Sequence, residues 1–241
     1  MKVCCLSFTY PKDAYKAVIA KALMPPEWQA IWCVESKDAN MPVPDGVQMM
    51  IEDFPRGAHL NVPESIAGIQ RCYLKLAQEY DVIIKMDSDV SLFVPHAFDK
   101  PILDSGADFV YVRRTPDECK EGLCNGSIYA MSRKAVNYLK GIDLKPIVQY
   151  RDGHEDLTFS HFFRINTPFL NISQLDKFLV DWCVHRYVGK DCIFGHYGYV
   201  SVAEMFRRTI TMLQLQGRAF SEEQLAYITS YMKLLDSLYQ K

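Results

Sequence analysis

A short run of apolar residues at Val82–Met86 constrains the fold of this chain more than any other feature of its sequence. Such a run is typical of a strand buried on both faces of a parallel sheet. An amphipathic helix is predicted directly before it, with an apolar stripe formed by Ile66, Ile69, Tyr73, Leu76 and Tyr80. We therefore predict that this helix leads into a central strand, which ends where the polar residues begin at Asp87.

Strands and helices alternate through the first part of the chain. Strands are predicted at 2–8, 28–34 and Val47–Ile51, and a helix at 13–23. This order favours an α/β fold with a mostly parallel central sheet flanked by helices, in which ligands bind at the carboxyl ends of the strands. Further strands are predicted at Phe109–Arg113, 127–131 and 178–184, and further helices at 132–141 and 156–163.

The chain from Ser201 onward is predicted to be mostly helical. Ser221 and Gln224 form a capping-box pattern at the start of the last helix. Its predicted apolar stripe consists of Leu225, Ile228, Met232, Leu235 and Leu238. We expect residues 1–200 to form one domain and residues 201–241 to be a helical extension packed on it.

Composition limits the classes of partner. The chain has 241 residues, 49% of them hydrophobic and 23% charged, with a formal charge of -2, so a strong non-specific grip on nucleic acid or membrane is disfavoured. The start of the chain has only a brief apolar stretch, and no segment approaches the roughly 20 apolar residues of a membrane span. We expect a cytoplasmic protein without an integral membrane segment.

The eight cysteines are expected to be reduced and buried, because most lie in apolar runs of a chain long enough to fold without disulfides. A zinc site formed by Cys119, Cys124, Cys183 and Cys192 is the alternative. Neither pair has the short C-x-x-C spacing of most structural zinc sites, which disfavours it.

Two carboxylates, Asp87 and Asp89, follow the predicted strand Val82–Met86. Spaced two residues apart, they can be presented on one face at the edge of a cleft, which suits a divalent cation that holds a diphosphate. The alternative is a solvated turn whose aspartates cap backbone N–H groups.

Three later segments could take part in ligand binding or catalysis. Glu155 and Asp156 stand at the predicted start of a helix. They could take part in a reaction, and the alternative is that they only cap the helix. His196 follows a glycine. It could be a functional histidine, and the alternative is an ordinary loop histidine. Gly126 opens a predicted strand, where it could permit close approach of a ligand or simply form a bulge.

Taken in order, these motifs resemble those of GT-A fold glycosyltransferases. The resemblance rests on four segments, namely 82–90, 125–132, 154–157 and 195–196, and it is nearest to the inverting galactosyltransferase and Fringe-like group, whose members similarly have a lysine shortly before the Asp-x-Asp motif. It implies a GT-A, Rossmann-like fold and transfer of a hexose-type sugar from a nucleotide-sugar, most simply a UDP-sugar, to an acceptor hydroxyl.

The resemblance also implies roles for individual residues. Asp89 would bind Mn²⁺ or Mg²⁺ directly, Asp87 would reach the ribose or the metal through water, and His196 would be a late metal ligand. The metal would neutralise the leaving diphosphate. Asp156, with Glu155 second, would take the proton of the acceptor hydroxyl, and direct displacement would then invert the anomeric centre.

Further contacts are implied around these groups. The expected nucleotide and donor contacts are Phe8, Thr9, Tyr10, Glu35, Arg71, Lys85 and Ser88, and the expected sugar contacts are Asn125, Gly126 and His154. Secretory members of the group carry a membrane anchor and disulfides that are not evident here, so we expect an intracellular acceptor: a glycan, a lipid-linked sugar, a protein or a hydroxylated nucleobase in DNA.

Two other classes of protein compete with this interpretation. A nucleotidyltransferase acting on sugar phosphates generally needs a glycine-rich phosphate loop after its first strand, whereas the first glycine here is Gly46. The other class is a sugar-nucleotide or glycan binding module that kept the fold and lost turnover, and the intact set Asp87, Asp89, Asp156 and His196 argues against it.

Overall fold

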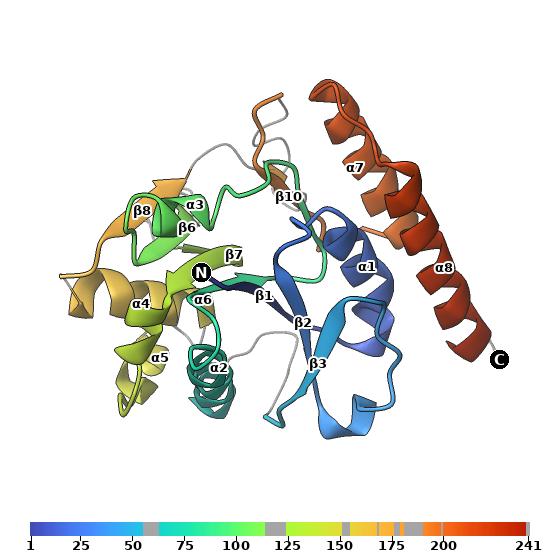
Figure 1. The fold of residues 1–241 in the computed structure, drawn as a ribbon. Helices are drawn as coiled ribbons and strands as arrows, with labels where there is room; N and C mark the ends of the chain where they lie inside the picture. Colours follow the sequence, from blue (N-terminus) through green and yellow to red (C-terminus); the bar gives the residue numbers. More distant parts are fainter. Residues whose placement is uncertain are drawn as a thin grey trace.

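The computed structural model describes residues 1–54, 63–113, 124–150, 155–167, 169–175, 179–180, 190–198 and 200–239. Its centre is a seven-stranded sheet (Figure 1). The strands are β1 (Val3–Phe8), β2 (Gln29–Val34), β3 (Val47–Ile51), β4 (Val82–Met86), β6 (Phe109–Arg113), β7 (Cys124–Ser132) and β8 (Ile172–Leu175). Their order across the sheet is β3-β2-β1-β4-β7-β6-β8.

The sheet is mostly parallel. Strands β3, β2, β1 and β4 pair in parallel, and so do β6 and β8. Only β7 runs against its neighbours β4 and β6. This confirms the predicted α/β class, and the carboxyl ends of β1, β2 and β4 lie along one edge because parallel strands share a direction.

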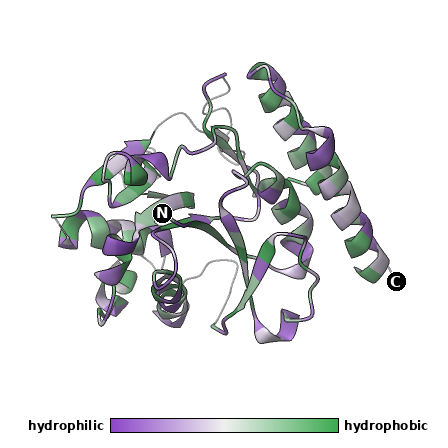
Figure 2. Ribbon diagram, in the orientation of Figure 1, coloured by the Kyte–Doolittle hydropathy of each residue, from purple (hydrophilic) through white to green (hydrophobic). Residues whose placement is uncertain are grey.

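Alternation along the strands separates two apolar layers. Leu6 and Ile83 belong to one buried cluster, whereas their neighbours Cys5 and Ile84 belong to another. The first layer is covered by α2 (Pro63–Leu76), α4 (Arg133–Asn137), α5 (Lys145–Tyr150) and α6 (Glu155–His161), and the second by α1 (Ala14–Ala22) and α3 (Lys100–Leu103). Hydrophobic residues accordingly concentrate in the central strands (Figure 2).

A second, three-stranded sheet lies beyond the end of β4. It consists of β5 (Val90–Leu92), β10 (Phe194–His196) and β9 (Leu179–Val180) in the order β5-β10-β9. Strand β10 runs antiparallel to β5, and His196 is the register partner of Val90. Sequence patterns did not predict β5 or β10, because three-residue strands are too short for a periodic signal.

Helices α7 (Val202–Leu215) and α8 (Glu222–Tyr239) pack beside α1 (Figure 1). Side-chain hydrogen bonds tie them to the rest of the chain: Tyr15 donates to Asp236 at 2.9 Å, and the hydroxyls of Ser91 and Thr209 lie 2.8 Å apart. The capping box at the start of α8 is confirmed, since the backbone amide and side chain of Ser221 both bond to Gln224.

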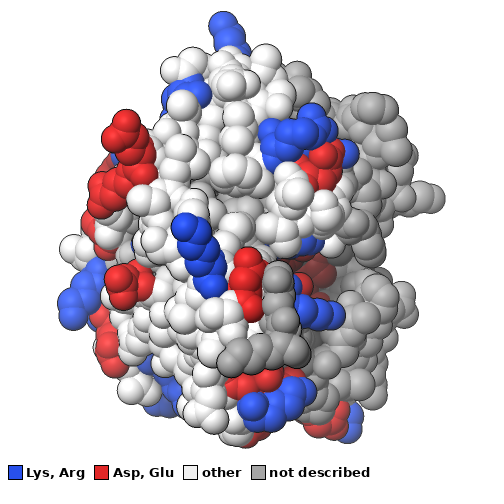
Figure 3. Space-filling model, turned by 90° about the vertical axis from the view of Figure 1, so that its right-hand side faces the viewer, with Lys and Arg blue, Asp and Glu red and all other residues white. Residues whose placement is uncertain are grey.

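The predicted apolar stripe of α8 is only partly buried. Ile228 and Leu235 are in the core, but Leu225 and Leu238 are 40% and 50% exposed, and Tyr231 is buried instead. The helix therefore faces α1 with a narrower stripe than predicted, because only one side of it has a packing partner. On this side of the molecule, basic and acidic side chains are interspersed among uncharged residues (Figure 3).

Several other predicted boundaries shift. Helix α2 ends at Leu76, before Tyr80, and α4 ends at Asn137, before Gly141. Ser132 caps α4 as predicted, by accepting a hydrogen bond from the amide of Ala135. The helix predicted at 156–163 begins at Glu155 and continues beyond α6 as a π-helical turn, Phe162–Asn166. Of the strand predicted at 178–184, the described part is Leu179–Val180.

The cysteines that the structure describes are buried thiols: Cys4, Cys5, Cys33, Cys72, Cys124 and Cys192. Cys119 and Cys183, two members of the alternative zinc set, lie outside the described residues. Among the described helices, none combines the length and apolar composition needed to cross a bilayer.

Asp108 joins three elements at the far edge of the sheet. Its buried carboxylate accepts hydrogen bonds from the Ser132 hydroxyl at 2.9 Å, the Lys134 ammonium at 2.8 Å and the Asn171 amide at 3.0 Å. Burial alone would raise the pKa of Asp108, but these donors lower it below its ordinary value.

We predict that Asp108→Asn lowers the free energy of unfolding by about 2 kcal/mol at neutral pH, because hydrogen bonds to a charged group are lost. A carboxyl with a lowered pKa in the folded state contributes stability that disappears as the pH falls through that pKa. Denaturation measured by circular dichroism should therefore show the two proteins converging below about pH 4. The exposed Asp104→Asn is the control; a constant difference at all pH values would contradict the assignment.

Candidate functional site

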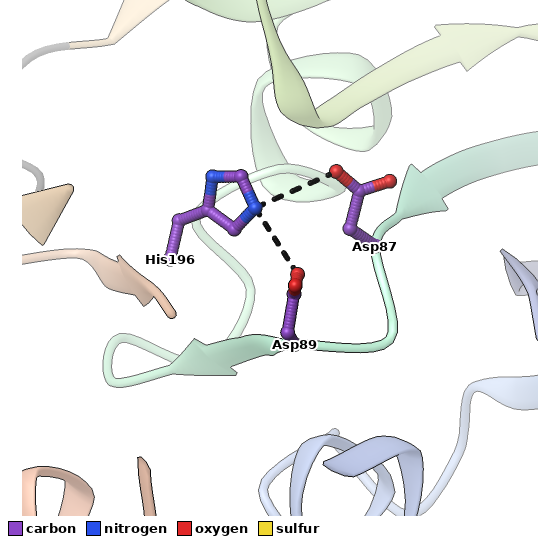
Figure 4. Close-up of side chains that lie close together, drawn as sticks. All are labelled: Asp87, Asp89 and His196. Carbon is purple, nitrogen blue, oxygen red and sulfur yellow. Dashed lines mark ion pairs between the residues drawn. The ribbon is translucent and has the colours of Figure 1, made fainter. Parts of the chain in front are cut away.

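Three side chains from distant parts of the chain converge beside the end of β4 (Figure 4). Nε2 of His196 lies 3.1 Å from Oδ1 of Asp89 and 3.7 Å from Oδ2 of Asp87. One potential ligand atom from each of the three lies within 4.8 Å of the others. Two carboxylates and one imidazole thus face a common point.

Backbone hydrogen bonds hold this arrangement in place. Asp87 directly follows β4, and its amide donates to the carbonyl of Ser127 in β7 at 2.8 Å. The amide of Tyr197 donates to the carbonyl of Asp89 at 3.0 Å and so extends the pairing of β10 with β5. The turn at Asp87 and Asp89 is therefore fixed on both sides, which determines where His196 meets it.

The electrostatic environment of the three groups is that of a partly buried anionic site. The side chains of His196 and Asp89 are 7% and 18% exposed, and that of Asp87 is 36% exposed. Burial alone would raise the pKa of Asp89, but the His196 imidazole and the Lys16 ammonium lower it below its ordinary value. Asp89 therefore remains ionised at neutral pH.

These residues fit a divalent cation. Oδ1 of Asp89 is buried, and no described residue donates a well-aligned hydrogen bond to it. Adjacent ligands of a six-coordinate Mg²⁺, at about 2.0–2.1 Å from the metal, lie roughly 3 Å apart. The separations from His196 Nε2 to the two carboxylates, 3.1 and 3.7 Å, are close to that value. An oxygen-rich set with one imidazole suits Mg²⁺ or Mn²⁺.

Lys85 lies beneath this site, inside the sheet. Its ammonium is 2.6 Å from Oδ1 of Asp87 and 3.5 Å from Oε2 of Glu155, and it also donates to the carbonyl of Gly126. Burial alone would lower the pKa of Lys85, but the carboxylates of Asp87 and Glu155 raise it above its ordinary value. The lysine is therefore a fixed positive charge next to the candidate metal ligands.

Glu155, at the start of α6, is enclosed by side chains. Its Oε1 accepts hydrogen bonds from the hydroxyls of Tyr73, at 3.2 Å, and Tyr129. Burial raises the pKa of Glu155, although Lys85 opposes the shift. Its side chain is 7% exposed, and both of its oxygens have internal partners.

Asp156 is adjacent to Glu155 and lies against Gly126 of β7. A Cβ added to Gly126 would come within 2.8 Å of the Cβ, Cγ and Oδ2 atoms of Asp156. The side chain that approaches the Gly126 backbone closely is therefore that of Asp156. Both acidic residues of the predicted pair are buried.

The expected nucleotide contacts are distributed along the carboxyl edge of the sheet. Phe8 ends β1, Thr9 bonds through its amide to the carbonyl of Cys33 at 3.0 Å, and Tyr10 precedes the 3₁₀ turn Pro11–Asp13. Glu35 follows β2 and pairs with Lys37 at 2.6 Å. These residues share one edge with Asp87, since β1 is paired with both β2 and β4.

The other predicted contacts are less uniform. Arg71 is on α2, and its guanidinium pairs with Glu52 at 2.8 Å rather than with the candidate metal ligands. Ser88 is buried between the two aspartates. Asn125 belongs to β7, and its side chain is not described; His154 lies outside the described residues.

Two residues near the site, Lys16 in α1 and Asp13 directly before it, were not among the predicted site residues. Lys16 donates to the carbonyls of Tyr197 and Gly198, at 3.1 and 3.2 Å, directly after His196. Burial raises the pKa of Asp13, and the nearby carboxylates of Asp89 and Asp87 raise it further against the effect of Lys12. Their only sequence signal is a position shortly after the first strand, where ligand-contacting loops lie in α/β folds.

Comparison with known proteins finds similarity in structure only. No protein-family model matches the chain, and no curated protein matches it. A glycosyltransferase involved in the glycosylation of the major capsid of PBCV-1 aligns with a TM-score of 0.48 and 14% identity, over 87% of this chain and 98% of that chain. Mouse xyloside xylosyltransferase 1 in its apo form aligns with a TM-score of 0.48 and 14% identity, over 82% and 98%.

We predict that Gly126→Ala lowers the free energy of unfolding by about 1–3 kcal/mol, because the added methyl group overlaps the Asp156 side chain. Chemical denaturation measures the loss. In a double-mutant cycle with Asp156→Gly, the same change should cost less, since the obstructing atoms are gone. An equal cost in both backgrounds would contradict the observed contact.

Proposed function

We propose that this protein is a metal-dependent glycosyltransferase that moves a sugar from a UDP-sugar to an acceptor hydroxyl with inversion. The observation that carries the proposal is the convergence of Asp87, Asp89 and His196 at the end of β4. It matches the motif order that resembles GT-A enzymes, and it lies at the sheet edge where α/β folds bind their ligands.

The donor diphosphate would bind beside this cluster. Asp89, Asp87 and His196 would hold Mn²⁺ or Mg²⁺, which when bound neutralises charge that develops on the departing diphosphate. Lys85, fixed against Asp87 at 2.6 Å, adds a positive charge below it. With the leaving group stabilised in this way, the chain needs no separate acid.

The nucleoside would extend along the carboxyl edge toward β1 and β2. In our proposal, the nucleoside contacts there are Phe8, Thr9, Tyr10 and Glu35, and Ser88 lies near the phosphates. Arg71 could contribute only after leaving Glu52, with which it pairs at 2.8 Å. We therefore rank Arg71 below the residues at the strand ends.

Asp156 is the proposed general base. Glu155 receives two tyrosine hydroxyls and faces Lys85, and Asp156 packs against Gly126 near the start of β7. A carboxylate there can accept the proton of an acceptor hydroxyl as it attacks the anomeric carbon, which inverts the configuration. We propose Asn125, Gly126 and His154 as sugar contacts.

The acceptor is one of the hydroxyl-bearing classes expected from the sequence, a glycan, a protein or a hydroxylated nucleobase in DNA, and a cytoplasmic location remains a prediction. A thermal-shift screen with UDP-, GDP-, CMP- and dTDP-sugars, with and without Mn²⁺, tests the donor directly, because a bound ligand raises the melting temperature. We expect a metal-dependent shift with a UDP-sugar. No shift with any donor would contradict a nucleotide-sugar site and would favour a structural module.

We predict that Asp89→Asn weakens binding of UDP in the presence of Mn²⁺ by more than roughly 100-fold, since losing even an outer-shell partner of a metal costs about 10–100-fold. Isothermal titration calorimetry measures the affinity, and circular dichroism checks the fold. The exposed Asp45→Asn is the matched control and should bind as the wild type does. Unchanged affinity of the Asp89 variant would exclude the metal role.

We predict that Asp156→Asn keeps the affinity for UDP and Mn²⁺ but lowers the transfer rate by about 10²–10⁴-fold, the usual contribution of a general base. Stopped assays with a donor and acceptor identified by the screen measure the rate, and NMR of the product reports the anomeric configuration. Near-normal turnover would remove Asp156 as the base, and retention would exclude direct displacement.

A further inference from the structure

A chain of polar side chains, buried except for Asp87, connects the candidate metal cluster to the helix that carries Asp156. It begins at Asp87, passes through Lys85 and Glu155, and ends at the hydroxyls of Tyr73 and Tyr129. Tyr73 and Tyr129 belong to the buried cluster on one face of the central sheet, and alternation along β4 places Lys85 on the same face as Ile83 of that cluster. The sequence analysis placed Lys85 among the donor contacts and Glu155 among the possible bases.

The two oxygens of Glu155 have different partners. Oε1 accepts from the hydroxyls of Tyr73 and Tyr129, whose own oxygens are also within hydrogen-bond distance of each other. Oε2 lies 3.5 Å from the ammonium of Lys85. Because the tyrosines hold one oxygen from two separate elements, the other is aimed at Lys85.

Lys85 in turn has little freedom to move. It is the cross-strand register partner of Tyr129, and its ammonium lies 5.8 Å from the centre of that ring. It is 4% exposed, and its acceptors are Asp87, Gly126 and, at longer range, Glu155. A buried ammonium needs a countercharge, so removing Glu155 leaves Asp87, already the nearer of the two paired carboxylates, to provide it.

We propose that Glu155, held by Tyr73 and Tyr129, is a positioning residue that fixes Lys85 and, through it, the orientation of Asp87 in the metal cluster. The inference rests on the proposed function. Without Glu155, Lys85 loses one of its two ion-pair partners and can shift. Because Lys85 holds Asp87 at 2.6 Å, the Asp87 carboxylate would then shift relative to His196. Metal affinity would then depend on a residue that does not touch the metal, as outer-shell partners do.

The same chain links the two ends of the site. Glu155 and Asp156 are consecutive on α6, and the Gly126 carbonyl that receives Lys85 belongs to the residue against which Asp156 packs. Lys85 thus contacts both the candidate metal ligand Asp87 and the glycine against which the proposed base packs.

The test uses Glu155→Gln in the full chain, with calorimetric titration of UDP in the presence of Mn²⁺. We expect the affinity to fall by about 10–100-fold while circular dichroism remains that of the wild type. Tyr129→Phe, a milder change that also serves if the first variant does not fold, should lower the affinity in the same direction. Added to Glu155→Gln, it should cause little further loss, because both act through one carboxylate.

Tyr111→Phe is the matched control. Tyr111 is the register partner of Tyr129 in the next strand and is equally buried, but its hydroxyl bonds to Gln174 at 3.2 Å. Removing this hydroxyl should leave the affinity for UDP and Mn²⁺ unchanged. A loss equal to that of Tyr129→Phe would mean that any buried hydroxyl has the effect, which would overturn the proposal.

Kinetics separate positioning from proton transfer. With saturating Mn²⁺ and donor, Glu155→Gln should recover kcat to within about 10-fold of the wild type, while KM for the donor stays raised. A loss of kcat as large as that of Asp156→Asn would make Glu155 the base and overturn the proposal. Wild-type affinity in a folded Glu155→Gln would overturn the positioning role of Glu155 but not the proposed function. Absence of UDP and Mn²⁺ binding by the wild-type protein would overturn both.

Discussion

The pairing of β10 with β5 is the interaction on which the candidate site depends. It places His196, 107 positions after Asp89 in the chain, opposite Val90, and the Tyr197 amide extends the pairing to the carbonyl of Asp89. Helix α1 secures the far side, because Lys16 donates to the two carbonyls that follow His196. Without this small sheet, the aspartates after β4 would form an ordinary acidic turn, which alone does not specify a ligand.

Nearby positive charges and hydrogen-bond donors explain why this acidic turn is stable at the edge of the sheet. Asp87, Asp89 and Glu155 outnumber the ammonium of Lys85 in one partly buried region, and burying an uncompensated carboxylate is costly. The protein offsets part of this cost with Lys85, Lys16 and two tyrosine hydroxyls. The remaining negative charge faces the point shared by the carboxylates and His196, so a bound cation would complete the compensation.

Much of the fold was predictable from local patterns. Strands β3, β4 and β6 have the predicted bounds, because short, mainly apolar runs bounded by polar residues or glycine define them. The caps at Ser132 and Ser221 were predictable because they depend on residues three positions apart. The exposure of Leu225 and Leu238 was not, since a helical stripe shows which side is apolar but not how much of it finds a partner.

By itself, the sequence determined a mostly parallel α/β sheet and a pair of carboxylates at the end of a buried strand, because both follow from residues that are neighbours in the chain. Only the tertiary structure decided that His196 reaches those carboxylates, that Glu155 is enclosed by Tyr73 and Tyr129, and that Asp156 fills the space at Gly126. Each of these contacts joins elements far apart in sequence, where no periodicity reports distance and packing alone sets which side chains meet.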